Sequence, residues 1–195
     1  MGWEAHDPDK GKGPDLKDLR KKLGISTQEE APPLQAIPHK DLVAKYPLFK
    51  DSVGFQRGTI YHPCGANDIS PSVAFPGSRV IYADIEDGFM RVVRQAGYEA
   101  YAVDVLTFHP GPVDVLILLN PQIKPNIPAS FVKENGYVLC NDYHNTATIL
   151  RQNGYKPLAI IRMTKKGLLY DTENPGEYWT EIETDEEFQN AMAKL

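Results

Sequence analysis

The 195-residue chain lacks long hydrophobic runs and a strong excess of either charge, and each absence excludes a class of protein. No apolar run approaches the ~20 residues of a membrane-spanning helix. A net charge of −5 gives no basis for binding nucleic acid or a membrane surface. The start of the chain, MGWEAHDPDKGKGPD, is polar and charged, which is not typical of a signal peptide. We therefore expect a cytoplasmic protein with no membrane or nucleic-acid partner.

Cysteine is scarce as well, with Cys64 and Cys140 the only two. They lie far apart and have no neighbours at metal-ligand spacing, so the sequence predicts no metal site and a reducing compartment. Cys64 has no base close to it in sequence, and we expect it to pack rather than to act as a nucleophile. His62, His109 and His144 are likewise expected to be separate surface histidines.

Composition divides the chain into an N-terminal arm, residues 1–57, and a domain, residues 58–195, with an acidic C-terminal segment. The arm is rich in proline and poor in β-branched residues. It is expected to contain short helices at 15–24 and 37–49, the second broken at Pro47. A lid over a cleft and a strap in a homodimer are both open readings of the arm.

Strand-like and helix-like segments alternate from residue 58 onward. This cadence predicts an α/β fold: a doubly wound, mostly parallel sheet of six to seven strands with helices on both faces. The expected strands are 58–64, 79–85, 99–106, 113–120, 137–142 and 156–163, followed by a hairpin strand within 170–183. One expected helix begins at Ser70-Pro71, and three others cover residues 88–98, 128–136 and 145–155.

Polar residues stand where these strands end, which is where ligands bind in sheets of this kind. The segment His62–Gly65 follows the first strand. Single polar residues end the next three, at Asp84, Asp104 and Asn120, and Asn141-Asp142 end the fifth. The pattern indicates a ligand-binding cleft at one edge of the sheet.

The loop YHPCGANDISPS, residues 61–72, has one glycine where a dinucleotide fingerprint needs three, and no GxxxxGK[ST] motif occurs in the chain. This argues against a dinucleotide reductase and excludes a P-loop. A cofactor without phosphates needs less: one close backbone approach at Gly65 and an acid for a ribose, here Asp84, about 20 residues on. Asn67 can adopt the left-handed backbone that a second glycine would supply.

The stretch YHPCGANDISPSVAFPGSRVIYADI resembles the first motifs of class I, Rossmann-like S-adenosylmethionine-dependent methyltransferases, in a divergent bacterial-type branch. VDVLILLNPQ is similar to the fourth motif of that family, and FVKENGYVLCND to the passage into its fifth strand. The resemblance covers residues 58 to about 165.

The resemblance implies S-adenosylmethionine as cofactor and assigns roles to particular residues. It places the methionine part at the loop, the ribose and adenine after the second and third strands, and the reacting methyl group after the fourth. The loop residues concerned are Pro63, Cys64, Gly65 and Asn67. Asp84 and Ile85 follow the second strand, Asp104 and Val105 the third, and Asn120 and Pro121 the fourth. Asp142, Tyr143 and His144 are expected to line the acceptor pocket.

The departures from the family pattern bear on function. The loop has Cys64, Ala66 and Asn67 around its single glycine. Asn120-Pro121 is not followed by the aromatic residue that stacks a flipped base, which argues against a nucleobase substrate. The leading hypothesis is a methyltransferase acting on a small molecule. The alternative is a catalytically degenerate domain of the same fold that binds or regulates an unknown protein partner.

Overall fold

The computed structural model describes residues 33–119, 121, 123–164 and 167–173. The expected helix at 15–24 and the residues from 174 onward lie outside this part of the chain. The described residues from Leu34 onward belong to one compact unit.

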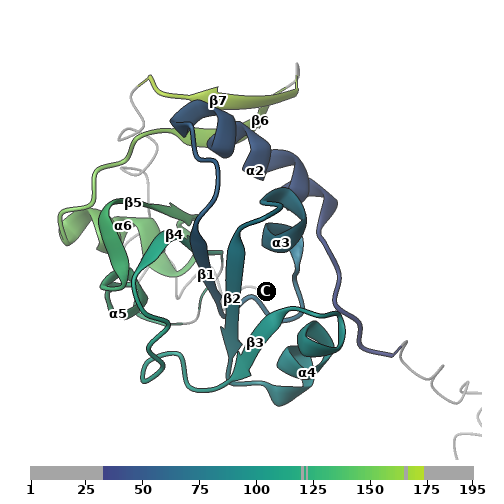
Figure 1. Cartoon of the computed structure of the whole chain (residues 1–195). Coiled ribbons are helices and arrows are strands. Elements are labelled where there is room, and N and C mark those ends of the chain that lie inside the picture. Colours follow the sequence, from purple (N-terminus) through teal and green to yellow (C-terminus); the bar gives the residue numbers. More distant parts are fainter. Residues whose placement is uncertain (1–32, 120, 122, 165–166, 174–195) are drawn as a thin grey trace, which may run out of the picture. The chain divides into compact units, whose positions relative to one another are not determined.

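Five parallel strands form the central sheet in the order β3-β2-β1-β4-β5 (Figure 1). The strands are β1 (Thr59–Pro63), β2 (Arg79–Asp84), β3 (Glu99–Ala102), β4 (Val113–Leu118) and β5 (Val132–Cys140). β1, β2 and β4 are buried over almost their whole length, because helices cover both faces. Strand order reverses between β1 and β4, the switch point beside which such sheets bind ligands. The expected methyltransferase-like, doubly wound fold is confirmed.

Two apolar clusters hold the helices to the two faces of the sheet. One combines Tyr46 and Phe49 of α2 (Lys40–Val53) and Met90 and Val93 of α4 (Asp87–Gln95) with Phe75, which directly follows α3 (Ser70–Ala74). The other cluster includes Ala129 and Leu150, from α5 (Asn126–Ala129) and α6 (Thr146–Gln152). A short 3₁₀ turn, η1 (Tyr143–Asn145), precedes α6.

Helix α2 continues through Pro47, where the sequence analysis expected a break. Pro47 lies in the third turn and costs the helix one backbone hydrogen bond. Tyr46 and Phe49, each 3% exposed, fix the helix to the sheet, with ring contacts to Phe75 at 5.4 and 6.2 Å between centroids. Tertiary packing therefore outweighs the local penalty, and α2 belongs to the core.

The expected helix at 128–136 is wrong for most of its length, because α5 ends at Ala129 and β5 begins at Val132. Asn135 has a left-handed backbone with φ 63°, and the β4–β5 register is irregular between Val113 and Val115. A Cβ at Gly136 would lie 3.0 Å from the carbonyl oxygens of Asp114 and Lys133. Gly136 thus permits an irregularity in a strand instead of ending a helix.

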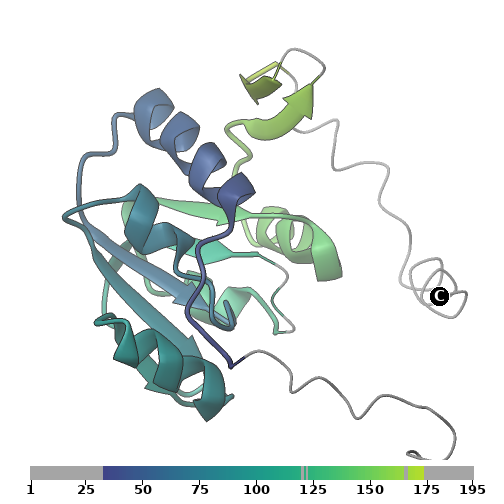
Figure 2. The ribbon, with the colours of Figure 1, turned by 90° about the vertical axis from the view of Figure 1, so that its right-hand side faces the viewer.

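The remaining strands form a separate antiparallel hairpin, β6 (Ile160–Thr164) with β7 (Gly167–Asp171). The hairpin packs against α2 (Figures 1 and 2) and not beside β5. The described sheet therefore has five strands instead of the expected six to seven, and β5 is one of its two edge strands, with β3 at the other edge. No described helix has the length and apolar character needed to cross a membrane.

Candidate functional site

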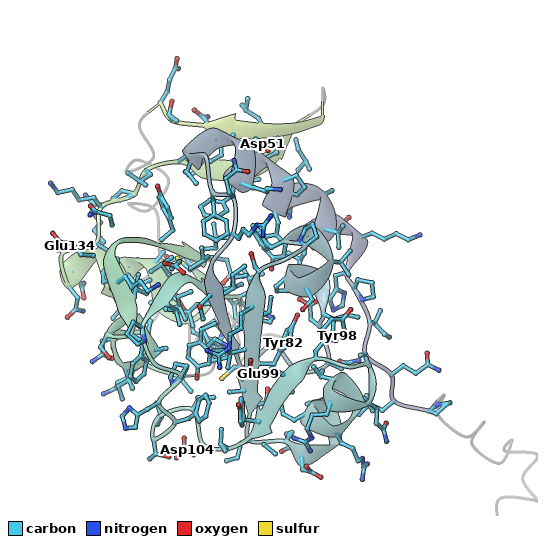
Figure 3. The ribbon with its side chains drawn as sticks, in the orientation of Figure 1. Asp51, Tyr82, Tyr98, Glu99, Asp104 and Glu134 are labelled. Carbon is cyan, nitrogen blue, oxygen red and sulfur yellow. The ribbon has the colours of Figure 1, made fainter. Side chains whose placement is uncertain are left out.

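The carboxyl ends of β1, β2 and β3 lie at one edge of the sheet and carry three of the predicted site residues. The Cys64 amide donates to the Ala83 carbonyl at 2.8 Å, and the Val103 amide to the Asp84 carbonyl at 2.9 Å. Cys64 and Asp84 are therefore neighbours across the sheet. Asp104 follows at the end of β3 (Figure 3).

The electrostatics of Cys64 report the same convergence. Burial and, to a smaller extent, the carboxylates of Asp84 and Asp104 together raise the pKa of its thiol to about 12. Both acids therefore lie near one thiol, although they belong to different strand ends. The thiol is protonated at neutral pH and is a poor nucleophile, as a packing role requires.

The loop after β1 has a left-handed backbone at two residues that are not glycine. Cys64 has φ 55° and Ala66 φ 50°. The expectation of a left-handed Asn67 is wrong, since Asn67 is not among the described residues with positive φ. Non-glycine residues in this region cost about 1 kcal/mol or more each, and such strain concentrates at functional sites. The loop thus has, at two positions occupied by other residues, the backbone conformation that glycine adopts most easily.

Gly65 faces the protein interior, and its close contact is with His62. A Cβ at residue 65 would lie 2.2 Å from His62 Nε2. His62 is 2% exposed, and its Nδ1 lies 3.3 Å from the Ile117 carbonyl oxygen. The expectation of a surface histidine is therefore wrong for His62. The loop needs its one glycine to fit over a buried imidazole.

Asp68 completes a buried polar group beneath the loop. Its carboxylate lies 3.5 Å from His62 Nε2 and accepts hydrogen bonds from the amide of Ser70, at 2.8 Å, and from the Ser70 hydroxyl. Burial raises the pKa of Asp68, but the close His62 ring and the hydrogen bonds from Ser70 outweigh it and hold the pKa below its usual value. Asp68 is therefore charged in the folded protein at neutral pH.

The segment Gln35–His39 fastens the outer side of the loop. The Ile37 amide donates to the Asn67 carbonyl at 3.0 Å, and the Ile69 amide donates back to the Ile37 carbonyl at 3.2 Å. Asn67 Nδ2 also donates to the Gln35 carbonyl at 2.5 Å. Asn67, predicted to touch cofactor, thus holds this segment in place.

Asp84 and Asp104 both accept hydrogen bonds from backbone amides. Asp84 is 9% exposed; its Oδ2 accepts from the Ala66 amide at 3.3 Å and its Oδ1 from the Glu86 amide at 3.0 Å. Asp104 Oδ1 accepts from the Leu106 amide at 2.9 Å. Each carboxylate oxygen keeps a further lone pair, so a ligand hydroxyl or amine can still donate to it.

The other predicted cofactor residues differ in exposure. Ile85 is 71% exposed, an unusual position for an apolar side chain beside a polar strand end. Pro63 and Val105 are buried, and Val105 packs with Tyr61 and Ile81 in the second apolar cluster. Phe75 lies in the opposite cluster and does not fill the strand-end site.

The structure describes only part of the predicted catalytic and acceptor set. Pro121 is buried, while Asn120 lies outside the described residues. Asp142 accepts hydrogen bonds from the Thr148 amide at 2.9 Å and from its hydroxyl at 3.0 Å, which stabilises the start of α6. The rings of Tyr143 and His144 are in contact, with centroids 4.3 Å apart.

A cavity of about 610 Å³ lies between α2, the edge strand β5, α6 and the segment that leads to β6. Leu119, Asn141 and Asp142 line it, so it reaches the carboxyl ends of β4 and β5. Sequence reasoning missed this cavity because its walls come from segments that are distant in the chain. The buried group of His62 and Asp68 was missed for the same reason, although an aspartate that accepts a hydrogen bond from the amide two residues on is a common local turn motif.

Comparison with known proteins gives structural likenesses only. No protein-family model matches the chain, and no curated protein matches it. The structures that match include a ribosomal protein L11 methylase from Lactobacillus delbrueckii subsp. bulgaricus, at TM-score 0.48 and 14% identity over 72% of this chain and 82% of that one. The structure of Thermoplasma acidophilum 1320 matches at TM-score 0.48 and 13% identity, over 81% of this chain and 97% of that one.

The N-terminal domain of EvdMO1, in a structure with SAH bound, matches at TM-score 0.34 and 16% identity. The match covers 43% of this chain, which spans 40% of the EvdMO1 chain. All three scores are below 0.5, and the description of the fold as methyltransferase-like rests on strand order and register.

Proposed function

We propose that the chain binds S-adenosylmethionine at the carboxyl ends of β1, β2 and β3 and transfers its methyl group to a small molecule. The observation that carries this proposal is the meeting of Cys64, Asp84 and Asp104 beside the switch point of the sheet. The left-handed loop at Cys64 and Ala66 supports it, since backbone strain of this kind favours a functional site.

The residues present fit the cofactor. Asp84 has lone pairs left for the ribose hydroxyls, and Asp104 has lone pairs for the adenine amine. Ile85, 71% exposed, offers an apolar surface for the adenine ring. The methionine part would lie along the loop at Cys64 and Ala66. S-adenosylmethionine, when bound, supplies a methyl group on a positively charged sulfur.

The chain's own contribution would be positioning. Alignment of the nucleophile, the methyl carbon and the sulfur provides most of the acceleration, so no strong acid–base pair is needed. The His62–Asp68 group and the Gln35–His39 segment hold the loop from both sides, and buried Pro121 follows β4 at the expected place of transfer. The residues that touch the cofactor would therefore need little rearrangement on binding.

Calorimetry on the full chain with S-adenosylhomocysteine tests the proposal. We expect saturable binding that weakens at least about tenfold in Ile85→Asp, because a carboxylate would replace the apolar surface. Ile85 is exposed, so this variant should fold. Leu169→Asp, at a residue of β7 that is 41% exposed and does not line the cavity, should bind as the wild type does. No binding by the wild-type protein, or unchanged binding by Ile85→Asp, contradicts the proposal.

A second candidate is a binding module of the same fold without transfer activity. Two observations favour it: Cys64 and Ala66 occupy positions that suit glycine, and the Asp84 oxygens already accept two backbone amides. S-adenosylhomocysteine binding without methyl transfer to any of a panel of small organic acids would favour this candidate.

A further inference from the structure

We propose that the cavity between α2, β5 and α6 is a binding site for a small aromatic carboxylate. The site is separate from the three strand ends discussed above. Its volume of about 610 Å³ lies within the range of small-molecule sites, roughly 300–1,000 Å³. Phe49, Val138, Leu139, Leu150 and Ile161 supply apolar walls from four different segments.

The aromatic character of the cavity comes from α2, β5 and β7. Phe49 and Tyr137 make an edge-to-face contact with centroids 5.4 Å apart, and both line the cavity. Tyr170 lines it as well; burial raises the pKa of Tyr170, and the nearby Tyr137 hydroxyl raises it further. Aromatic walls favour a flat ring, which they contact by stacked or edge-on packing.

The charge of the cavity selects an anion. Lys45 is half-buried in its wall and has no hydrogen bond or ion pair with any residue in the described part of the chain. Arg151 and Lys156 also line the cavity, whereas the carboxylate of Asp142 already accepts two hydrogen bonds from Thr148. No described group pairs with the ammonium of this half-buried residue, so a ligand carboxylate in the cavity can form a charge-assisted hydrogen bond with it.

The position of the cavity links it to the proposed function. The assignment of a methyl acceptor in this paragraph rests on that function. Leu119 and Asn141 line it at the ends of β4 and β5, next in sequence to the expected place of transfer. The bound acid would then be the methyl acceptor. A hydroxyl oxygen or amine nitrogen carried by the acid would bond to the methyl carbon as the carbon–sulfur bond breaks toward sulfur, and the proton of that group would pass to water.

The test uses the full chain and two probes that differ only in charge, 2-naphthoate and 2-naphthamide, with affinities measured by calorimetry. We expect 2-naphthoate to bind at least about tenfold more tightly, since the ion pair with Lys45 is partly desolvated. Lys45→Met should remove the difference between the probes, and Lys45→Arg should keep it. Lys40→Met, at an exposed lysine of the same helix, is the matched control.

A second variant addresses the volume of the cavity. Leu42 is half-buried in its wall, so Leu42→Trp should fill the space and abolish binding of both probes. S-adenosylhomocysteine should bind Lys45→Met and Leu42→Trp with the affinity of the wild type. Loss of S-adenosylhomocysteine binding in the wild type, with naphthoate binding intact, would contradict the proposed function and leave the cavity site standing.

Three results would overturn the inference: no binding of 2-naphthoate to the full chain, equal affinity for the two probes, or unchanged naphthoate binding by Lys45→Met. Hydrogen exchange then identifies the competing occupant. If every amide of Tyr137–Cys140 is protected without ligand, including the alternate ones that point away from β4, another strand covers this edge.

Discussion

The two halves of the central sheet differ at their carboxyl ends. On the β1–β2–β3 side, the polar groups are tied to backbone amides, and a buried histidine and aspartate support the loop from beneath. On the β4–β5 side, no residue of β5 is fully buried, and a cavity follows the strand. One half is built to hold a fixed shape, while the other leaves room. This is the division expected between a cofactor site and a site for a variable acceptor.

The cysteines test the comparison with the largest expected effect, because there is one in each half. The pKa of both thiols is raised to about 12, mainly by burial and in smaller part by Asp84 and Asp104 at Cys64 and by Asp142 at Cys140. Both should react with iodoacetamide at pH 8 about 10³-fold more slowly than a free thiol of pKa about 8.5.

Asp104→Asn separates the two cysteines. Removing that charge lowers the pKa of Cys64 and should speed its alkylation several-fold, with Cys140 unchanged, as mass spectrometry of the labelled sites can measure. Fast labelling of wild-type Cys64, or equal acceleration at both sites, would show that the three strand ends do not meet.

Gly65→Ala should break the rigid half. Its Cβ would meet the His62 ring at 2.2 Å, and we expect a loss of about 3 kcal/mol in the free energy of unfolding, measured with urea. His62→Ala should absorb most of that loss, so the double variant should be more stable than the sum of the single effects implies. Additive losses would contradict the packing of Gly65 on His62.

Asp68→Asn removes the charged acceptor beneath the loop and should cost about 2 kcal/mol. The folded pKa of Asp68 is lowered, so its contribution is complete above the unfolded pKa of about 3.9 and is lost as the pH falls through the folded value. Wild-type stability should therefore fall below about pH 4 more steeply than that of Asp68→Asn. Asp41→Asn, at an exposed acid on α2, should leave the loss of stability at acidic pH as it is in the wild type.

Ala66→Gly should give the smallest effect, a gain of about 1 kcal/mol, because glycine adopts the left-handed backbone at residue 66 without strain. Ala44→Gly, at an exposed position inside α2, should lose about 1 kcal/mol under the same conditions. Opposite signs in thermal or urea unfolding support the described loop, and equal losses would contradict it.

The same division decides how much the sequence could predict. Strands β1, β2 and β4 follow from short β-branched runs, and the strand-end acids Asp84 and Asp104 follow from those runs ending. The start of β5 was misread as helix because Lys133, Glu134 and Asn135 have low β propensity and lie in the irregular part of the β4–β5 register, between the pairs Val113–Val132 and Val115–Tyr137. The local sequence pattern therefore predicts the strands of the rigid half, whereas β5 in the other half depends on residues that are distant in the chain.

The contacts that hold the loop in place could not be predicted from the local sequence pattern, for a related reason. Gln35 lies 32 residues before Asn67, and His62 lies 55 residues before Ile117, yet each pair is joined by a hydrogen bond or close polar contact. Spacing along the chain gives no sign of such partners. The lone glycine was correctly singled out, but its neighbour was unknown, so its packing role could not be foreseen.

Amide NMR during a titration of the full chain with S-adenosylhomocysteine tests most directly whether the ends of β1, β2 and β3 form a single adenosyl site. Our account predicts saturable shifts at Cys64, Ala66, Glu86 and Leu106 with one common affinity, and little change in β6 and β7. Shifts confined to the lining of the cavity, or no shifts at any concentration that the ligand's solubility allows, would contradict it.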